Sequence, residues 1–276
     1  MRTLMSLAAL LALYRPLNLA AVALAATVGA RLGSQPLSLF EMLVPVLVAA
    51  FGYARNDAVD LAADRLNRPD RPLPSGRLSP RVAHAAAWLA LLAAGASFAA
   101  TSRDSGSAGI ALGAALTLHA YSPWLKERGP AGPFAIALLT FLTVIWGAWG
   151  SPRAERAFLP ALLAASAQGA RECVKHLEDA PGDRAAGRKT WVVTAGAERV
   201  RAAARLLLLA ALLLLPLPAT GGGLGARYLA AALPTAGVLF LVAFAALGGK
   251  APRYGRISAT LKLSLFAGLA ALAFAA

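Results

Sequence analysis

Residues 38–64 read SLFEMLVPVLVAAFGYARNDAVDLAAD and place an apolar run directly before a group of carboxylates. The run at 38–54 is close to the roughly 20 residues that cross about 30 Å of hydrocarbon as a helix. Similar runs recur along the chain, at residues 16–32, 38–54, 82–101, 107–124, 132–150, 157–172, 200–218, 227–248 and 257–275. The pattern predicts nine transmembrane helices in a single transmembrane domain that covers residues 1–276.

The composition is typical of a membrane protein. Hydrophobic residues make up 58% of the chain and charged residues 14%, and the mean hydropathy is +0.62. These values exclude an ordinary soluble domain. The apolar runs are rich in Ala, Leu and Gly and do not alternate with polar residues, which excludes a porin-like barrel and favours closely packed helices. We therefore predict an all-α integral membrane protein.

The first 14 residues are also apolar, and they need a separate interpretation. A cleaved signal peptide has an uninterrupted apolar core before its small-residue cleavage site. Here Arg15 and Pro16 stand before the candidate site at Ala23 and Ala25. We therefore expect residues 1–14 to form a short interfacial helix that leads into the first span.

The distribution of Lys and Arg predicts the orientation, because basic residues are retained in cytoplasmic loops. With the N-terminus in the cytoplasm, 21 of the 27 Lys and Arg residues lie on the cytoplasmic side, Lys250 among them, 5 lie outside, and Lys262 lies within the last span. We predict a multi-pass protein of the cell's inner (plasma) membrane with a cytoplasmic N-terminus. The net charge of +14 is then mainly a topology signal and an anion-handling surface, so we expect no nucleic-acid binding. No pattern indicates an obligatory protein partner.

The chain has only 13 acidic residues, and eight of them lie in two short stretches. The eight are Asp57, Asp60, Asp64, Asp70, Glu172, Glu178, Asp179 and Asp183. Carboxylates at the end of a membrane helix are costly unless they are paired or coordinate a metal ion. Both stretches belong to predicted cytoplasmic loops, at residues 55–81 and 171–199, so they lie on the same side of the membrane.

In the first stretch Asn56, Asp60 and Asp64 recur every four residues and share one face of a helix. Oxygen ligands without a neighbouring His or Cys favour Mg²⁺, which also binds substrate phosphates. In the second stretch Asp179 and Asp183 are four residues apart, but Pro181 also allows a turn or a helix start before Asp183. Two acidic faces with interspersed Arg and Lys suit a diphosphate held by bridging metal ions, and the chemistry suits ionisation of an allylic diphosphate.

These stretches also resemble a known family. Asn56-Asp57-x-x-Asp60-x-x-x-Asp64, followed by the Asn-Arg-Pro-x-Arg-Pro of residues 67–72, resembles the first motif of the UbiA superfamily of membrane prenyltransferases. Glu178-Asp179-x-x-Gly182-Asp183, followed by Gly187-Arg188-Lys189-Thr190, resembles its second motif. The Tyr-Ser-Pro-Trp-Leu-Lys of residues 121–126 matches a weaker third pattern, and Arg15-Pro16-x-Asn18 and Lys262 also fit.

The resemblance implies nine transmembrane helices around a central cavity, the UbiA-like barrel, with aspartate loops at its cytoplasmic end. It implies Mg²⁺-dependent transfer of an isoprenyl group from a prenyl diphosphate to a lipophilic acceptor, either an aromatic ring or a lipid alcohol. The implied metal ligands are Asn56, Asp57, Asp60, Asp64, Asp179 and Asp183, of which Asp60, Asp64, Asp179 and Asp183 are the candidate catalytic residues. The implied diphosphate-binding residues are Arg68, Arg71, Lys126 and Lys189.

The sequence leaves two features undecided: the acceptor, together with the role of His176, and the choice between an enzyme and another class of membrane protein. The motifs are most similar to the archaeal lipid-forming branch, the geranylgeranylglyceryl phosphate geranylgeranyltransferases, but His176 stands where that branch often has Asp, which leaves the acceptor undecided. His176 is either a structural residue or a proton acceptor. A membrane transporter or binding protein for an organic or lipid diphosphate is the alternative function, and a non-catalytic scaffold is a weaker one. Against transport, no pair of spans is conspicuously interrupted by Gly or Pro.

Overall fold

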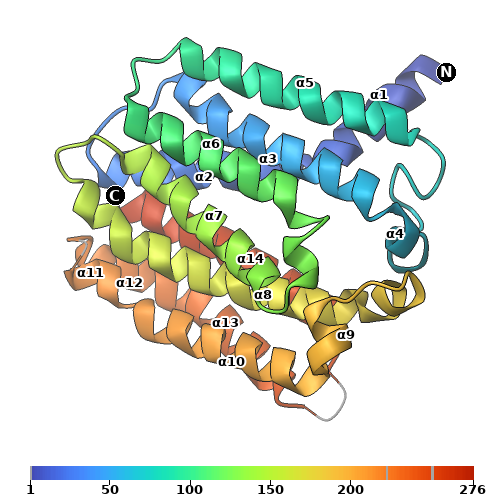
Figure 1. The fold of residues 1–276 in the computed structure, drawn as a ribbon. Coiled ribbons are helices and arrows are strands. Elements are labelled where there is room, and N and C mark those ends of the chain that lie inside the picture. Colours follow the sequence, from blue (N-terminus) through green and yellow to red (C-terminus); the bar gives the residue numbers. More distant parts are fainter. Residues whose placement is uncertain (1, 222, 250–251) are drawn as a thin grey trace.

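The computed structural model describes residues 2–221, 223–249 and 252–276, and no strand occurs in these three segments. Met1, the first residue of the predicted interfacial helix, and Lys250, one of the predicted cytoplasmic cations, lie outside them. The prediction of an all-α protein is confirmed. Figure 1 shows the long helices side by side, with α4 and α9 at one end of the bundle and α11 at the other.

The helices follow the apolar runs closely. The α-helices are α1 (Arg2–Tyr14), α2 (Pro16–Leu32), α3 (Leu39–Val59), α4 (Leu61–Asn67), α5 (Pro80–Ala99), α6 (Ser105–Tyr121), α7 (Ala131–Ala148), α8 (Phe158–Ala185), α9 (Trp191–Ala195), α10 (Ala197–Leu214), α11 (Leu217–Thr220), α12 (Gly225–Ala232), α13 (Val238–Leu247) and α14 (Tyr254–Ala275). Two 3₁₀ turns, η1 (Leu125–Glu127) and η2 (Ala154–Ala157), and a π-helical turn, η3 (Leu233–Gly237), join some of them.

Six helical segments of the described chain are long and apolar enough to cross a membrane. They are α3, α5, α7, α10 with α11, α12 with α13, and α14. A seventh is formed if α1 and α2, which meet at 45°, count as one broken span. The other two predicted spans lie on α6, which has only 17 residues, and on α8, whose C-terminal half is charged. The chain is therefore a multi-pass membrane protein, and the count of nine spans stays a prediction.

Local sequence explains where several helices begin and end. Pro16 starts α2, and because a proline disfavours helical backbone in the residue before it, the chain breaks at Arg15. Arg15 adopts a left-handed conformation there, with φ 52° and ψ 67°. A capping box formed by Ser38 and Glu41 starts α3. Side-chain capping by Asp104 starts α6.

The two predicted aspartate loops are largely helical. α3 extends beyond its apolar run to Val59, and α4 follows directly after Asp60. The backbone N–H of Asp60 bonds to the carbonyl of Asn56, and that of Asp64 to the carbonyl of Asp60, so the spacing of one turn is kept through this junction. Pro181 neither starts nor ends a helix, because α8 runs through it to Ala185. Asp179 and Asp183 therefore lie one turn apart on one helix.

Small residues let α2 and α7 approach very closely. A Cβ atom added to Gly29 of α2 would lie 1.9 Å from the carbonyl oxygen of Val144, and one added to Gly147 of α7 would lie 1.9 Å from the carbonyl oxygen of Ala26. Neither contact leaves room for a methyl group. The two helices are held together by backbone contact, as is common for small residues in membrane helix pairs.

We expect Gly29→Ala or Gly147→Ala to lower the stability of the protein by about 1–3 kcal/mol, because the added methyl group forces the two backbones apart. The measurement is the unfolding temperature in detergent. Gly113→Ala on α6 is the matched control, since a Cβ atom there meets no other atom within 4 Å. An unchanged unfolding temperature in both variants would contradict this account of the α2–α7 contact.

The helices enclose a cavity of about 850 Å³ whose walls come from α2, α3, α6, α7, α8 and α14. Apolar residues such as Val44, Val48 and Leu139 line part of it. The end near α4 is polar, because Asp57, Asp60 and other charged residues line it. A cavity of this kind can hold a molecule with a charged group and an apolar tail.

Candidate functional site

Asn67 joins the two acidic stretches. Its side-chain nitrogen donates a hydrogen bond to the carbonyl oxygen of Asp179 (2.7 Å), and its side-chain oxygen accepts one from the backbone N–H of Gly182 (2.9 Å). Gly182 is required for this approach, because a Cβ atom there would lie 2.5 Å from the Asn67 amide. The end of α4 is thus fastened to the C-terminal part of α8, and the aspartates of both stretches face one region.

Lys126 links the two stretches electrostatically. Its ammonium group lies 2.8 Å from a carboxylate oxygen of Asp60 and 3.8 Å from one of Asp183. Arg188 approaches the other oxygen of Asp60 at 2.8 Å. Asp60 is 3% exposed and Asp183 is fully buried. Although burial opposes the charge on Lys126, the two carboxylates raise the pKa of its ammonium group above the usual value.

The remaining acids of the site are also paired with cations. Arg71 lies 2.6 Å from Asp64 and 3.3 Å from Asp57. Arg15 forms an ion pair with the same Asp57. On the other stretch, Arg68 contacts Glu178 at 2.9 Å and Asp179 at 3.0 Å.

Burial makes the site unfavourable for bare carboxylates. It raises the pKa of Asp64 above the usual value, against the opposing effect of Arg71, and it raises the pKa of Asp183, against that of Lys126. Both carboxylate oxygens of Asp183 are buried and accept no hydrogen bond. A cation placed between the stretches would stabilise the ionised forms of these groups.

The donor set fits Mg²⁺. Within the described segments no three His, Cys, Asp or Glu side chains form a ready-made metal cluster. Mg²⁺, however, is usually bound by only one or two carboxylates together with substrate phosphates and water. Asp183 offers two unsatisfied buried oxygens. Asn56, which accepts a 2.7 Å hydrogen bond from Ser122 through its side-chain oxygen, lines the cavity, whereas Asp183 is not among the lining residues.

The predicted diphosphate-binding residues are not all brought together. Arg68, Arg71 and Lys126 line the cavity, whereas Lys189 is exposed and is not among its lining residues. Arg188, the preceding residue, contacts Asp60 instead. Adjacent residues after the tight turn at Gly187 (φ 69°) direct their side chains differently, and the sequence does not show which of the two faces inward.

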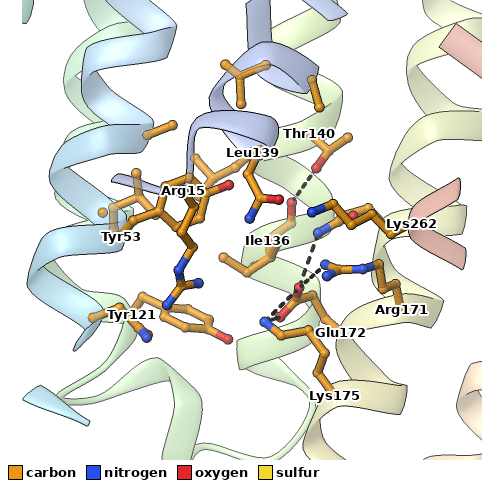
Figure 2. A pocket seen from close by; sticks show the side chains of 18 of the residues that line it. Arg15, Tyr53, Tyr121, Ile136, Leu139, Thr140, Arg171, Glu172, Lys175 and Lys262 are labelled. Carbon is orange, nitrogen blue, oxygen red and sulfur yellow. Dashed lines mark hydrogen bonds and ion pairs between the residues drawn. The ribbon is translucent and has the colours of Figure 1, made fainter. Parts of the chain in front are cut away.

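A second polar group lies in the same cavity. Its residues were given no role of their own from the sequence, although Glu172 was counted among the clustered acids. Glu172, buried at 4% exposure, contacts Lys175 at 3.2 Å and Arg171 at 3.4 Å. Figure 2 shows these side chains with Lys262 on one side of the pocket, and Arg15 on the other beside Tyr53 and Tyr121. The spacing of 171, 172 and 175 along one helix was the available signal.

His176 is a buried residue of α8, with 2% exposure, and neither of its ring nitrogens has a hydrogen-bond partner. Burial lowers the pKa of the ring to about 4, and the positive charge of Lys126 acts in the same direction. The imidazole is therefore neutral near pH 7. It lines the cavity and faces Gly132, where a Cβ atom would lie 3.4 Å from the ring.

Comparison with known proteins places the chain among its relatives. Residues 16–266 match the model of the UbiA prenyltransferase family. The digeranylgeranylglyceryl phosphate synthase of Methanopyrus kandleri is 37% identical over 266 residues, which cover 95% of this chain and 97% of that protein. The synthase of the same name from Halobacterium salinarum is 37% identical over 212 residues, covering 76% and 75% of the two chains.

Solved structures have the same fold. A structure of a digeranylgeranylglyceryl phosphate synthase superposes with a TM-score of 0.74 at 26% identity and covers 98% of both chains. A UbiA homolog from Archaeoglobus fulgidus, solved with bound GPP and Mg²⁺, superposes with a TM-score of 0.67 at 21% identity, over 95% of this chain and 99% of that one. At that identity the second likeness supports the fold alone.

Proposed function

The chain belongs to the UbiA prenyltransferase family, and from this premise we propose that it transfers an isoprenyl group from a prenyl diphosphate to the hydroxyl group of a glycerophosphate lipid, with Mg²⁺ bound between the two acidic stretches. Its relatives are named as digeranylgeranylglyceryl phosphate synthases, which supports a lipid acceptor over an aromatic one. Membership of an enzyme family also disfavours the transporter and scaffold alternatives.

The observation that carries the proposal is the contact of Lys126 with Asp60 and Asp183. This one ammonium group faces a carboxylate from each stretch, at the charged end of a cavity with apolar walls. A diphosphate bound there meets Lys126 directly, with Arg188 held on the neighbouring Asp60, and a prenyl chain extends among the apolar residues. The arrangement suits an amphiphilic donor whose reacting carbon lies between the two regions.

In the proposed reaction the bond between the allylic carbon and the diphosphate oxygen breaks, and the diphosphate leaves with the bonding electrons. Lys126, Arg188, Arg68 and Arg71 stabilise the charge that develops on the leaving group. Mg²⁺, when bound by the aspartates of both stretches, supplies further charge neutralisation. The acceptor oxygen then forms a bond to the same carbon and loses its proton, inside a cavity that restricts competing attack by water.

The experiment is a transfer assay on the purified full-length protein in detergent, with radiolabelled prenyl diphosphates of several chain lengths. Three acceptors are compared: a prenylglycerol phosphate, the same lipid without its phosphate, and a hydroxybenzoate. We expect a labelled diether lipid phosphate from the first acceptor. Transfer to the hydroxybenzoate alone would overturn the proposed acceptor, and no transfer with any acceptor would overturn the proposed reaction.

Arg188 and Lys189 are adjacent cations with different expected roles. Arg188 contacts Asp60 at 2.8 Å, whereas Lys189 is exposed. We expect Arg188→Ala to reduce kcat/KM for prenyl transfer by about 10- to 100-fold, as for the loss of a hydrogen bond to a charged group. Lys189→Ala should change it by less than about threefold, within the weak effect of an exposed charge. The reverse order of the two effects would restore Lys189 to the diphosphate site.

We further infer that the acidic stretches and the N-terminus face the cytoplasm in a nine-span topology in the inner (plasma) membrane, on the basis of the Lys and Arg distribution. Ser75 and Ala185 are exposed near the acidic stretches, and Ser102 is exposed in the α5–α6 connection. In oriented vesicles, Ser75→Cys and Ala185→Cys should react with an impermeant thiol reagent from the cytoplasmic side, and Ser102→Cys from the other. The native Cys173 is buried and should not react. The opposite labelling pattern would invert the topology.

A further inference from the structure

Four basic side chains line the cavity: Arg15, Arg171, Lys175 and Lys262. Arg15 also pairs with Asp57, whereas the other three form no ion pair with an aspartate of the described residues. They come from the α1–α2 break, from α8 and from the middle of α14. Arg171 lies eight residues before Asp179 on α8, so it is about 12 Å further along the helix axis. In Figure 2 Arg15 faces the other three basic residues across the pocket.

The negative charge around this basic cluster is too small to balance it. Glu172 is shared by Arg171 and Lys175, and Arg15 shares Asp57 with Arg71. Among the described residues, Lys262 forms no ion pair and no hydrogen bond. Buried or half-buried charges of one sign repel each other, and such charges inside a membrane protein mark a functional site by default. The cluster therefore requires an anion.

The anion is not the leaving diphosphate of the donor. Lys126, Arg188, Arg68 and Arg71 already contact the aspartates at the end of the cavity where that group is proposed to bind. Arg171 and Lys175 pair with Glu172 instead, about two turns and one turn before Asp179 on α8, and apolar residues such as Leu139 and Val48 line the same cavity. An anion at this depth must belong to a molecule that also has an apolar part.

We propose that Arg15, Arg171, Lys175 and Lys262 bind the phosphomonoester of the acceptor lipid and direct its free hydroxyl group toward the donor. This inference rests on the function proposed above. A phosphomonoester carries nearly two negative charges at neutral pH and has three acceptor oxygens, which matches several converging cations better than a carboxylate with one charge. The apolar walls receive the lipid chain.

Two features support a role in positioning the headgroup. Glu172 accepts hydrogen bonds from Lys175 and Arg171, so it holds their side chains toward the pocket. Arg15 is held in a left-handed backbone conformation before Pro16, and its guanidinium stacks over Tyr53 at 5.1 Å. A non-glycine residue in this conformation is strained, and such strain is found preferentially at functional sites.

Lys262 gives the sharpest test, because its removal breaks no ion pair. We expect Lys262→Gln to raise KM for the prenylglycerol phosphate by about 10- to 100-fold, while KM for the prenyl diphosphate changes less than about twofold. Lys262→Arg should restore much of the loss. The matched control is Arg256→Gln, an exposed position on the same helix that does not line the cavity. A raised KM for the donor with an unchanged KM for the acceptor would assign Lys262 to the donor site and overturn the proposal.

A binding measurement separates this inference from the proposed transfer reaction. The probes are hexadecylglycerol phosphate, hexadecylglycerol without the phosphate, and inorganic phosphate, added to the detergent-solubilised full-length protein. We expect only the phosphorylated lipid to raise the unfolding temperature, and Lys262→Gln to weaken that effect at least about tenfold in concentration. This result would support the site even if the transfer assay failed. Equal stabilisation by the neutral lipid, or by inorganic phosphate alone, would overturn it.

Discussion

Asp183→Asn is expected to reduce prenyl transfer by about two to three orders of magnitude, the range seen when one preorganised electrostatic group is removed from an active site. Asn has nearly the same shape as Asp but no charge, so it cannot balance Lys126, and it offers Mg²⁺ a neutral oxygen in place of a carboxylate. Asp60→Asn should have an effect of similar size, because Asp60 contacts Lys126 and Arg188 from the opposite stretch. The measurement is kcat/KM for transfer at saturating Mg²⁺.

The two variants should differ in stability, which distinguishes lost chemistry from lost folding. Asp183 is fully buried, accepts no hydrogen bond and has a pKa that burial raises, so a neutral residue there should leave the unfolding temperature unchanged or higher. Asp60 neutralises the buried Lys126 and the partly buried Arg188, and its loss should destabilise by about 3–5 kcal/mol, the usual cost of breaking a buried pair. Glu198→Gln, at an exposed residue of α10, is the control for both measurements. Parental activity in Asp183→Asn would exclude Asp183 from the site.

Much of the fold is local and could be predicted from the sequence. Most of the apolar runs are long enough to cross a bilayer by themselves, so they were placed on helices without any knowledge of their neighbours. The acidic stretches were found for the same reason, since a spacing of four residues lies within one turn. α6 and α8 were harder to interpret, because one is short and the other combines an apolar half with a charged half that continues through Pro181.

The parts that sequence did not predict depend on contacts between distant segments. Arg15, Glu172 and Lys262 line one cavity only because α2, α8 and α14 surround it, and nothing near any of them in the chain indicates that they share a pocket. The choice between Arg188 and Lys189 depends on how the chain leaves the turn at Gly187. Such details are decided by packing, whereas spans and motifs are decided by patterns within a few residues.

Removal of divalent metal is expected to abolish prenyl transfer and to leave the folded protein almost unchanged. The loss of activity follows because Lys and Arg alone cannot offset the charge of the aspartates and the diphosphate together. The stability should persist because the acids are already paired: Asp60 with Lys126 and Arg188, and Asp64 with Arg71. The measurements are transfer activity and unfolding temperature, each with a chelator and after Mg²⁺ is added back.

Mg²⁺ and the prenyl diphosphate should also stabilise the folded protein. A ligand that binds only the folded state adds stability that grows with the logarithm of its concentration relative to its Kd. At 100 times the Kd the gain is about 2.7 kcal/mol. Since the acidic stretches need both Mg²⁺ and an anionic partner for Lys126, Mg²⁺ and a prenyl diphosphate together should raise the unfolding temperature more than the sum of their separate effects. Asp183→Asn should remove this excess. Full activity in the presence of chelator, or unfolding caused by the chelator alone, would contradict a magnesium ion that acts in catalysis and not in folding.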